Sequence, residues 1–363
     1  MVLKPDFLAD RKLDILECTL RDGSYAVNFQ FTRADTEAIA GALDKAGFSL
    51  IEVGHGIGIG ASEKGLGKAA ETDEVYLDAT ARTVKNAKWG MFCIPGVARL
   101  DHLDMAASYG MNFIRIGTNV NEVEEAAPFI ERAKKLGMLV ASNFMKSYAL
   151  PPAEVAKVAR QAQDYGADIV YVVDSAGGML TDQLEAYFRA ILDTCNVPLG
   201  FHGHNNLQLG VANSLMAARV GVSVIDTSLQ GFGRSSGNTP TELLVMALER
   251  AGYKSGFDPI EIMDVGERFV RPLIDSKGLD PIDMVSGYAQ FHSSYMGIIR
   301  EMSSRHKVDP RRLIVEVCRH NLLAADRELV ERVAKELAQT RSEANLSSAR
   351  FRFERYHGAE ETI

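Results

Sequence analysis

Eight short apolar runs, separated by segments with a helical pattern, constrain the fold of this chain more than any other feature. They are rich in Val, Ile, Leu and Phe with little polar alternation, as expected of strands buried on both faces. The runs are Leu13–Thr19, Ser49–Gly54, Lys88–Ile94, Asn112–Gly117, Met138–Phe144, Asp168–Asp174, Val197–Gly203 and Ser223–Leu229. Several helical segments between them end in a glycine that can close a helix in the left-handed conformation, namely Gly47, Gly137, Gly166 and Gly221. Eight such units in about 240 residues predict a (β/α)8 TIM barrel.

The alternative architecture is an open doubly wound sheet, but the chain lacks a glycine-rich dinucleotide turn, which favours the barrel. The strand runs stop after Arg250, and residues 258–340 show only helical patterns. We therefore expect a barrel over residues 1–255, a helical C-terminal domain over residues 256–340 that caps the barrel or contacts a partner, and a polar tail over residues 341–363.

Charge, apolar patterning and cysteine spacing narrow the class of partner and the expected location of the protein. The formal net charge of −8 and the pI near 5.6 argue against nucleic acid or an anionic membrane. No apolar run approaches the roughly 18 residues of a membrane span, and the N-terminus has no apolar signal-peptide segment. The cysteines Cys18, Cys93, Cys195 and Cys318 have no CxxC spacing, which predicts buried free thiols. We expect a cytoplasmic protein that acts on a small molecule.

Polar residues follow several predicted strands at the end where the active sites of barrels lie. Asp22 follows the first strand, and His202 and His204 lie two residues apart on the seventh, so both imidazoles point to the same face. A carboxylate and two imidazoles aimed at the barrel mouth predict a metal site with positions open for substrate. The alternative is a pair of hydrogen-bonded core histidines. Iron in an oxygenase, Mn²⁺ and Mg²⁺ all suit such donors.

Arg21 lies next to Asp22 and is suited to neutralise an enolate or carboxylate oxygen without transferring a proton. Its alternative role is a structural salt bridge with Glu52, and both roles can hold because a carboxylate can orient such an arginine. Asn238, in the loop after the eighth strand, is a candidate metal ligand or substrate contact, or a plain turn residue. The glycine-rich segment His55–Gly67 is expected over the barrel mouth.

Five motifs lie at or beside the strand ends: Thr19–Ser24 (TLRDGS), Ile51–Gly56 (IEVGHG), Asp174–Gly177 (DSAG), His202–Leu207 (HGHNNL) and Gly231–Asn238 (GFGRSSGN). Together they resemble the lyase and aldolase superfamily that includes HMG-CoA lyase and isopropylmalate synthase, and most closely its 4-hydroxy-2-oxovalerate (4-hydroxy-2-oxoacid) aldolases. The segment Gly287–Tyr295 resembles the helical C-terminal region of these aldolases.

The resemblance implies a divalent metal, usually Mn²⁺ with Mg²⁺ or Co²⁺ as alternatives, on Asp22, His202 and His204. It also implies Arg21 as the enolate-stabilising cation and Ser175 near the substrate carboxylate. The implied reaction is reversible cleavage of a 4-hydroxy-2-oxoacid into pyruvate, or a related 2-oxoacid, and an aldehyde. An acylating aldehyde dehydrogenase is the implied partner, and we also expect self-association.

Two positions depart from the resemblance. The aldolases have their catalytic histidine where this chain has Tyr25, and a tyrosine where this chain has His292. Because a histidine pKa near 6.5 suits a base at neutral pH and a tyrosine pKa near 10 does not, we expect the base to be His292, with Tyr25 positioning substrate or relaying a proton. The spacing of Tyr288, His292 and Tyr295 predicts one helix face over the barrel mouth.

These observations predict a divalent-metal-dependent aldolase, a carbon–carbon lyase that uses a metal-stabilised enolate. One alternative is a Claisen-type acyl-CoA condensation on the same site, for which the sequence offers no CoA-binding signal. The other is a non-catalytic barrel that partners a dehydrogenase after losing its base.

Overall fold

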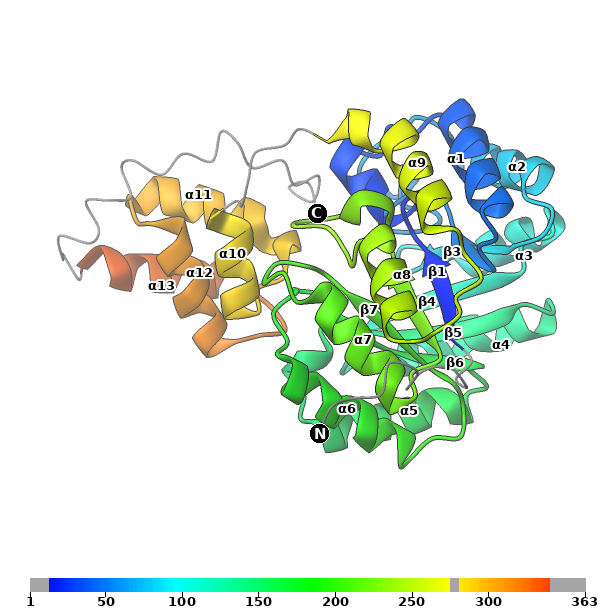
Figure 1. Ribbon diagram of the computed structural model, residues 1–363. Coiled ribbons are helices and arrows are strands. Elements are labelled where there is room, and N and C mark those ends of the chain that lie inside the picture. Colours follow the sequence, from blue (N-terminus) through cyan, green and yellow to red (C-terminus); the bar gives the residue numbers. More distant parts are fainter. Residues whose placement is uncertain (1–12, 275–280, 340–363) are drawn as a thin grey trace.

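The computed structural model describes residues 13–274 and 281–339 of the chain. Within them, eight parallel strands close into a barrel in sequential order, so the predicted TIM barrel is confirmed (Figure 1). The strands are β1 (Asp14–Glu17), β2 (Leu50–Glu52), β3 (Lys88–Cys93), β4 (Phe113–Asn119), β5 (Leu139–Met145), β6 (Ile169–Asp174), β7 (Leu199–Gly203) and β8 (Val224–Thr227). The N-terminal segment before Leu13 and the tail predicted over residues 341–363 lie outside the described residues.

Helices alternate with these strands and then continue beyond the barrel. They are α1 (Arg33–Lys45), α2 (Asp73–Thr83), α3 (Leu100–Ser108), α4 (Ala127–Lys135), α5 (Pro152–Asp164), α6 (Thr181–Leu192), α7 (Gly210–Val220), α8 (Thr241–Arg250), α9 (Pro259–Phe269), α10 (Pro281–Ala289), α11 (Met296–His306), α12 (Pro310–His320) and α13 (Arg327–Gln339). The four glycines predicted to close helices, Gly47, Gly137, Gly166 and Gly221, have φ angles of 92°, 79°, 104° and 114°. Left-handed glycines therefore turn these helices back toward the next strand, as expected.

The barrel interior has an apolar layer and, toward the carboxyl ends of the strands, a charged layer. The apolar layer is formed by Leu16, Cys18, Phe113, Ala141, Ile169, Tyr171, Val173 and Val224. Arg115 and Asp226 lie two positions after Phe113 and Val224, which belong to this layer, and Glu52 lies two positions after Leu50, which packs against it. Because side chains two apart on a strand point to the same side, all three charged side chains point into the barrel interior. All three are buried, so ion pairs must compensate their charges inside the barrel.

The helical region beyond the barrel divides between two cores. Helix α9 packs on α1 and α8, and its Ile262 belongs to the barrel core. Helices α10–α13 form a separate core that includes Ile282, Ile299 and Leu313. Figure 1 shows these four helices, yellow to orange-red, beside the barrel, whereas α9 stays with α1 and α8. The domain boundary near residue 256 stays a prediction, and we propose that the helical domain proper begins with α10.

Close backbone contact joins the helical domain to the barrel mouth. A Cβ on Gly178 would lie 2.0 Å from the Gly287 carbonyl oxygen, so these segments approach only because residue 178 is a glycine. Asn206 Nδ2 donates to the Asp283 carbonyl oxygen at 3.0 Å and lies 2.8 Å from Ser235 Oγ. These contacts hold α10 beside the loops that follow β6, β7 and β8.

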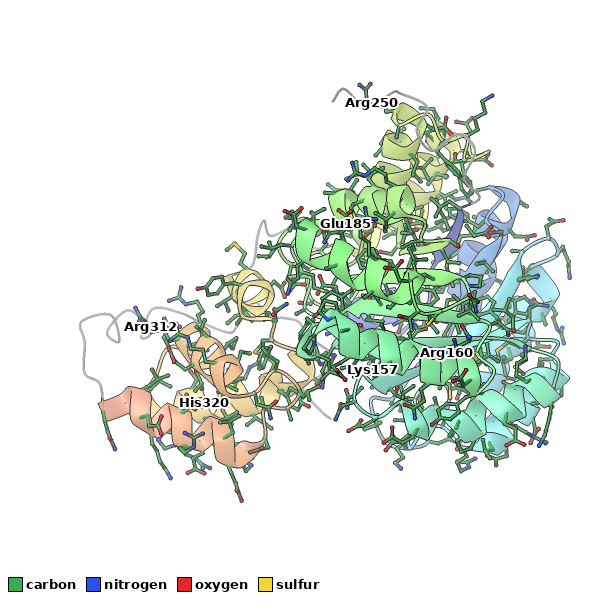
Figure 2. The ribbon with its side chains drawn as sticks, turned by 90° about the horizontal axis from the view of Figure 1, so that it is seen from below. Lys157, Arg160, Glu185, Arg250, Arg312 and His320 are labelled. Atoms are coloured by element: carbon green, nitrogen blue, oxygen red, sulfur yellow. The ribbon has the colours of Figure 1, made fainter. Side chains whose placement is uncertain are left out.

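The outer surface carries charged side chains. Figure 2 shows Lys157 and Arg160 on α5 and Glu185 on α6 at the outside of the barrel. Within the described residues, no helix combines the length and apolar character needed to cross a membrane. All four cysteines are buried and unpaired, as predicted.

Candidate functional site

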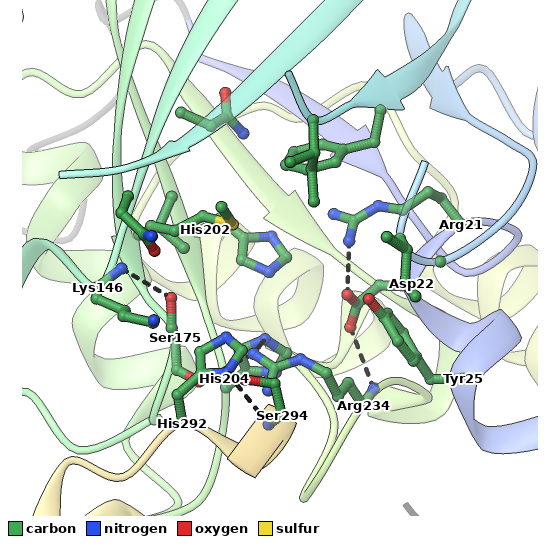
Figure 3. Close-up of a pocket in the computed structure, with 18 of the residues that line it drawn as sticks. Arg21, Asp22, Tyr25, Lys146, Ser175, His202, His204, Arg234, His292 and Ser294 are labelled. Carbon is green, nitrogen blue, oxygen red and sulfur yellow. Dashed lines mark hydrogen bonds and ion pairs between the residues drawn. The ribbon is translucent and has the colours of Figure 1, made fainter. Parts of the chain in front are cut away.

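A pocket of about 260 Å³ opens at the carboxyl ends of the strands, where the barrel meets the helical domain (Figure 3). One part of its wall is polar and includes Arg21, Asp22, Tyr25, Asn119, Asn143, Lys146, Ser175, His202, His204, Arg234, His292 and Ser294. The other part is apolar and includes Ile57, Leu66, Phe92, Ile94, Val97, Met145 and Val173. Of the predicted site residues, Glu52 and Asn238 do not line the pocket but contact Arg21 and Asp22, which do.

The three predicted metal ligands come together in this pocket. Asp22 begins the 3-10 helix η1 (Asp22–Val27) after β1, His202 lies on β7, and His204 directly follows the end of that strand. One ligand atom from each residue lies within 4.8 Å of the others, and all three residues are buried. The two histidine rings have centroids 5.1 Å apart and planes at 84°. A carboxylate and two imidazoles at this spacing could hold a divalent metal ion.

Asn238 provides an independent observation that these residues suit a cation. Its Nδ2 donates to Asp22 Oδ2 at 2.9 Å. Its Oδ1 is buried and has no hydrogen-bond partner among the described residues. A buried carbonyl oxygen without a partner is costly, and coordination to a cation would satisfy it. The donor set and this orphaned oxygen therefore fit the divalent ion that the motifs imply.

The protonation states of these ligands also suit a metal. Burial alone would raise the pKa of Asp22, but the neighbouring Arg21 guanidinium holds that pKa far below its usual range, so the carboxylate is ionised. Burial, followed by the charge of Arg234, lowers the pKa of His204 well below its usual value, so this imidazole is neutral. Ionised carboxylates and neutral imidazoles are the forms that bind metals.

Arg234 is a pocket residue to which the sequence analysis gave no role. Its Nη2 lies 2.7 Å from His204 Nε2 and donates to the Ser175 carbonyl oxygen at 2.9 Å. Its Nη1 donates to Ser293 Oγ, in the helical domain, at 2.5 Å. Arg234 therefore connects the candidate metal ligands to the helical domain. A metal ion on His204 Nε2 would replace the contact between Arg234 Nη2 and that nitrogen.

Arg21 forms the predicted salt bridge and also lines the pocket. Its Nε donates to Glu52 Oε2 at 2.7 Å, and its Nη1 donates to Asp22 Oδ1 at 2.6 Å. The guanidinium also lies 4.8 Å from the centre of the Phe92 ring. Burial opposes its charge, but Glu52 and Asp22 raise the pKa of Arg21. The result is a permanent cation in a fixed orientation beside the candidate metal ligands.

Ser175 lies beside a third pocket cation, Lys146. The backbone N–H of Lys146 donates to Ser175 Oγ at 3.0 Å, and this lysine adopts a left-handed conformation with φ of 58°. Its Nζ donates to the Leu323 carbonyl oxygen at 2.7 Å and to the Tyr295 hydroxyl at 3.2 Å, both in the helical domain. Burial lowers the pKa of Lys146 to about 8. This corner of the pocket therefore combines a hydroxyl with a cation.

Tyr25 and His292 both line the pocket, from η1 and from the residue before the 3-10 helix η6 (Ser293–Tyr295). In Figure 3, Tyr25 lies beside Asp22, whereas His292 lies near Ser294 and Arg234. His292 Nδ1 accepts from the Ser294 backbone N–H at 3.2 Å and lies 2.7 Å from Ser294 Oγ. Burial, and then the surrounding positive charges, lower the pKa of His292 well below its usual value, so its ring is neutral at physiological pH.

The predicted helix face of Tyr288, His292 and Tyr295 is wrong. Helix α10 ends at Ala289, and Gln290 adopts a left-handed φ of 56°, so the chain turns before His292. Tyr288 is 70% exposed and does not line the pocket. The helical spacing crosses a turn and therefore does not define a face. The turn nevertheless brings His292 to the barrel mouth.

The glycine-rich segment lies over the mouth as expected, because Ile57 and Leu66 line the pocket. His55, at its start, does not line the pocket. Its ring stacks on Phe29 with centroids 3.9 Å apart, its Nε2 lies 3.1 Å from the Gly67 carbonyl oxygen, and burial lowers its pKa to about 4. His55 therefore shapes the segment.

Asp226 is another residue that sequence reasoning missed. Its Oδ2 lies 2.8 Å from His202 Nδ1, which leaves His202 Nε2 for a metal ion. The sequence did contain a signal for this role, namely a single carboxylate on a short and otherwise uncharged buried strand. Such a carboxylate needs a buried partner to compensate its charge.

Comparisons with known proteins agree with this geometry. Residues 12–269 match the family model described as HMGL-like. The chain is 37% identical over 335 residues to the 4-hydroxy-2-oxovalerate aldolase of Moorella thermoacetica, in an alignment that covers 92% of this chain and 99% of that protein. It is also 37% identical over 330 residues to the protein of the same name from Carboxydothermus hydrogenoformans, covering 91% and 98%.

A solved structure shows the same fold. The N-terminal domain of a proposed aldolase from Bacteroides vulgatus superposes with a TM-score of 0.66 at 27% identity, covering 77% of this chain and 94% of that chain. Because the family model covers most of the chain and the named relatives match almost their whole length, this chain belongs to the HMGL-like family.

Proposed function

We propose that this protein is a divalent-metal-dependent aldolase that cleaves or forms a 4-hydroxy-2-oxoacid from pyruvate, or a related 2-oxoacid, and an aldehyde. The observation that carries the proposal is the placement of Asp22, His202 and His204 beside the fixed cation Arg21 in one buried pocket. The relatives named 4-hydroxy-2-oxovalerate aldolase favour this carbon–carbon lyase over an acyl-CoA condensing enzyme and over a non-catalytic barrel.

Asp22, His202 and His204 would hold the metal ion, and Asn238 Oδ1 would be a further oxygen donor. We propose Mn²⁺, with Mg²⁺ and Co²⁺ as alternatives, because the donors are mixed oxygen and nitrogen. When bound, such an ion supplies Lewis acidity toward the oxygen atoms of a 2-oxoacid.

Arg21 would neutralise the charge that develops during cleavage. Breaking the bond between C3 and C4 leaves its electron pair on the pyruvate fragment, where it delocalises onto the 2-oxo oxygen as an enolate. A guanidinium held by Glu52 and Asp22 can donate hydrogen bonds to this oxygen without losing a proton. Its orientation is set before substrate binds, so little reorganisation accompanies the reaction.

Ser175 and Lys146 would receive the substrate carboxylate. The Ser175 hydroxyl lines the pocket and accepts from the Lys146 backbone, so its own proton can be donated to a carboxylate oxygen. The nearby Lys146 ammonium adds a positive potential in the same corner.

His292 would accept the proton of the C4 hydroxyl. The ring is neutral and Nδ1 is occupied by Ser294, so Nε2 is the nitrogen left for substrate. For Nε2 to act as the base, the ring must adopt the tautomer in which Nδ1 carries the proton and donates it to Ser294 Oγ, and this tautomer gives up the hydrogen bond from the Ser294 backbone N–H. Transfer of the hydroxyl proton to Nε2 turns the C4–O bond into the aldehyde carbonyl as the carbon–carbon bond breaks. Tyr25 would position the substrate or relay this proton through its phenol.

The helical domain would be the contact surface for a dehydrogenase that consumes the aldehyde, and we also propose self-association and a cytoplasmic location. Co-purification from the native host tests the partner. Recovery of this chain only with itself would count against direct transfer of the aldehyde.

Product analysis tests the reaction. The protein, supplied with Mn²⁺ and 4-hydroxy-2-oxovalerate, is expected to release pyruvate and acetaldehyde in equal amounts, and a chelator should abolish their release. Condensation that requires an acyl-CoA, with no aldol cleavage, would favour the Claisen alternative. A protein that neither cleaves this substrate nor exchanges the methyl protons of pyruvate would favour the non-catalytic alternative.

A further inference from the structure

Five buried groups form a continuous chain of charge contacts across the barrel interior. Arg21 Nε donates to Glu52 Oε2 at 2.7 Å, and Arg115 Nη1 donates to the same oxygen at 2.8 Å. On its other side, Arg115 Nη2 donates to Asp226 Oδ2, and that oxygen also lies 2.8 Å from His202 Nδ1. Arg115 is therefore the central link between the cation Arg21 and the metal ligand His202.

The position of Arg115 is unusual for an arginine. It lies on β4 inside the barrel and is fully buried. Its guanidinium lies 4.6 Å from the centre of the Tyr171 ring and 5.8 Å from that of Phe92. Buried ion pairs are often no more stabilising than apolar residues of the same volume. Stability alone therefore does not account for two guanidinium groups and two carboxylates in this layer.

We propose that Arg115 is a positioning residue that fixes the distance and orientation of Arg21 relative to the metal ligand His202. This inference rests on the proposed function, in which the enolate oxygen is held by Arg21 beside the metal. Arg21 follows β1 and His202 lies on β7, so their backbones set the two positions separately. The planar guanidinium of Arg115 ties both carboxylates in one rigid unit. Arg115 does not line the pocket, so it acts only through these neighbours.

A charge-preserving substitution tests this role. Arg115→Lys retains the positive charge, but an ammonium cannot reproduce the two-armed contact with Glu52 and Asp226. Two losses are expected. The Kd for Mn²⁺, measured by calorimetry without substrate, should rise about 10- to 100-fold because His202 loses its fixed orientation. At saturating Mn²⁺, kcat for cleavage should remain at least about tenfold below wild type because Arg21 is also displaced.

Asp44→Asn is the matched control, because Asp44 is a buried carboxylate near the end of α1. It accepts from the backbone of Asn86 and Ala87, which precede β3 at the end of the barrel opposite the pocket. This variant should lower the melting temperature without changing the Kd for Mn²⁺. An unchanged Kd in Arg115→Lys, or full recovery of kcat at saturating Mn²⁺, would overturn the proposal. Wild-type protein that shows no Mn²⁺-dependent cleavage would instead refute the proposed function.

If Arg115→Lys does not fold, the near-isosteric variants Glu52→Gln and Asp226→Asn provide the test. Each variant breaks the same connection through Arg115. The loss in kcat/KM of the double variant should therefore be at least about tenfold smaller than the product of the losses of the two single variants. Losses that simply multiply would show two independent contacts and overturn the proposal.

Discussion

Replacement of His292 by alanine is expected to reduce cleavage strongly while leaving metal binding intact. A general base contributes about 10²- to 10⁴-fold to rate, which corresponds to about 2.7 to 5.4 kcal/mol of barrier. The low pKa of His292 makes it a weaker base, so we expect the lower half of this range, about 10²- to 10³-fold in kcat. The assay is pyruvate release from a 4-hydroxy-2-oxoacid that the wild-type protein demonstrably cleaves.

The pH dependence gives this prediction a second readout. The base works only when the ring is neutral. Because the pKa of His292 lies below 6.5, the neutral form persists as the pH falls through 6.5, and the acid limb of kcat in the wild type should lie below pH 6.5. That limb should disappear in His292→Ala.

Tyr288→Ala is the matched control, because Tyr288 is close in sequence but 70% exposed, and its activity should be unchanged. Mn²⁺ content should be the same in all three proteins. Turnover in His292→Ala close to that of the wild type would refute the reasoning and move the search for the base to Tyr25.

Three further changes test other parts of the site. Arg21→Lys should reduce kcat about 10²- to 10³-fold, because a point charge cannot reproduce the guanidinium contacts; a loss below about tenfold would leave Arg21 only its salt-bridge role. The double change Tyr25→His with His292→Tyr restores the arrangement of the aldolases that the chain resembles, and its cleavage rate should exceed that of His292→Ala; a rate no higher would argue against an exchange of roles. Gly178→Ala places a Cβ 2.0 Å from the Gly287 carbonyl oxygen and should destabilise the docked helical domain by about 1–3 kcal/mol. The protein should then unfold at a lower temperature, and an unchanged thermal transition would contradict the close contact.

The barrel and the cluster of Asp22, His202 and His204 could be predicted because their signals are local. Each strand is a short apolar run, and left-handed glycines mark helix ends within a few residues of the next strand. The period of two along a strand was enough to aim His202 and His204 at one face, and strand order placed Asp22 at the same end of the barrel.

The contacts that organise this group could not be predicted, because barrel closure joins residues far apart in the chain. Arg115 and Asp226 pair across 111 positions, and Arg234 reaches Ser293 across 59. Neither pairing has a spacing that a sequence pattern could reveal. The predicted helix face around His292 failed for a local reason, since the left-handed conformation of Gln290 has no glycine to signal it.

Exchange of the methyl protons of pyruvate with deuterium from solvent tests the central claim most directly, because it requires the enolate but no aldehyde. The measurement compares wild type and His202→Ala by NMR, each freed of metal and then titrated with Mn²⁺. The account predicts that exchange by the wild type appears only with Mn²⁺ and that His202→Ala binds Mn²⁺ weakly and exchanges far more slowly. Exchange that is equally fast without metal, or equal Mn²⁺ binding and exchange in the two proteins, would contradict it.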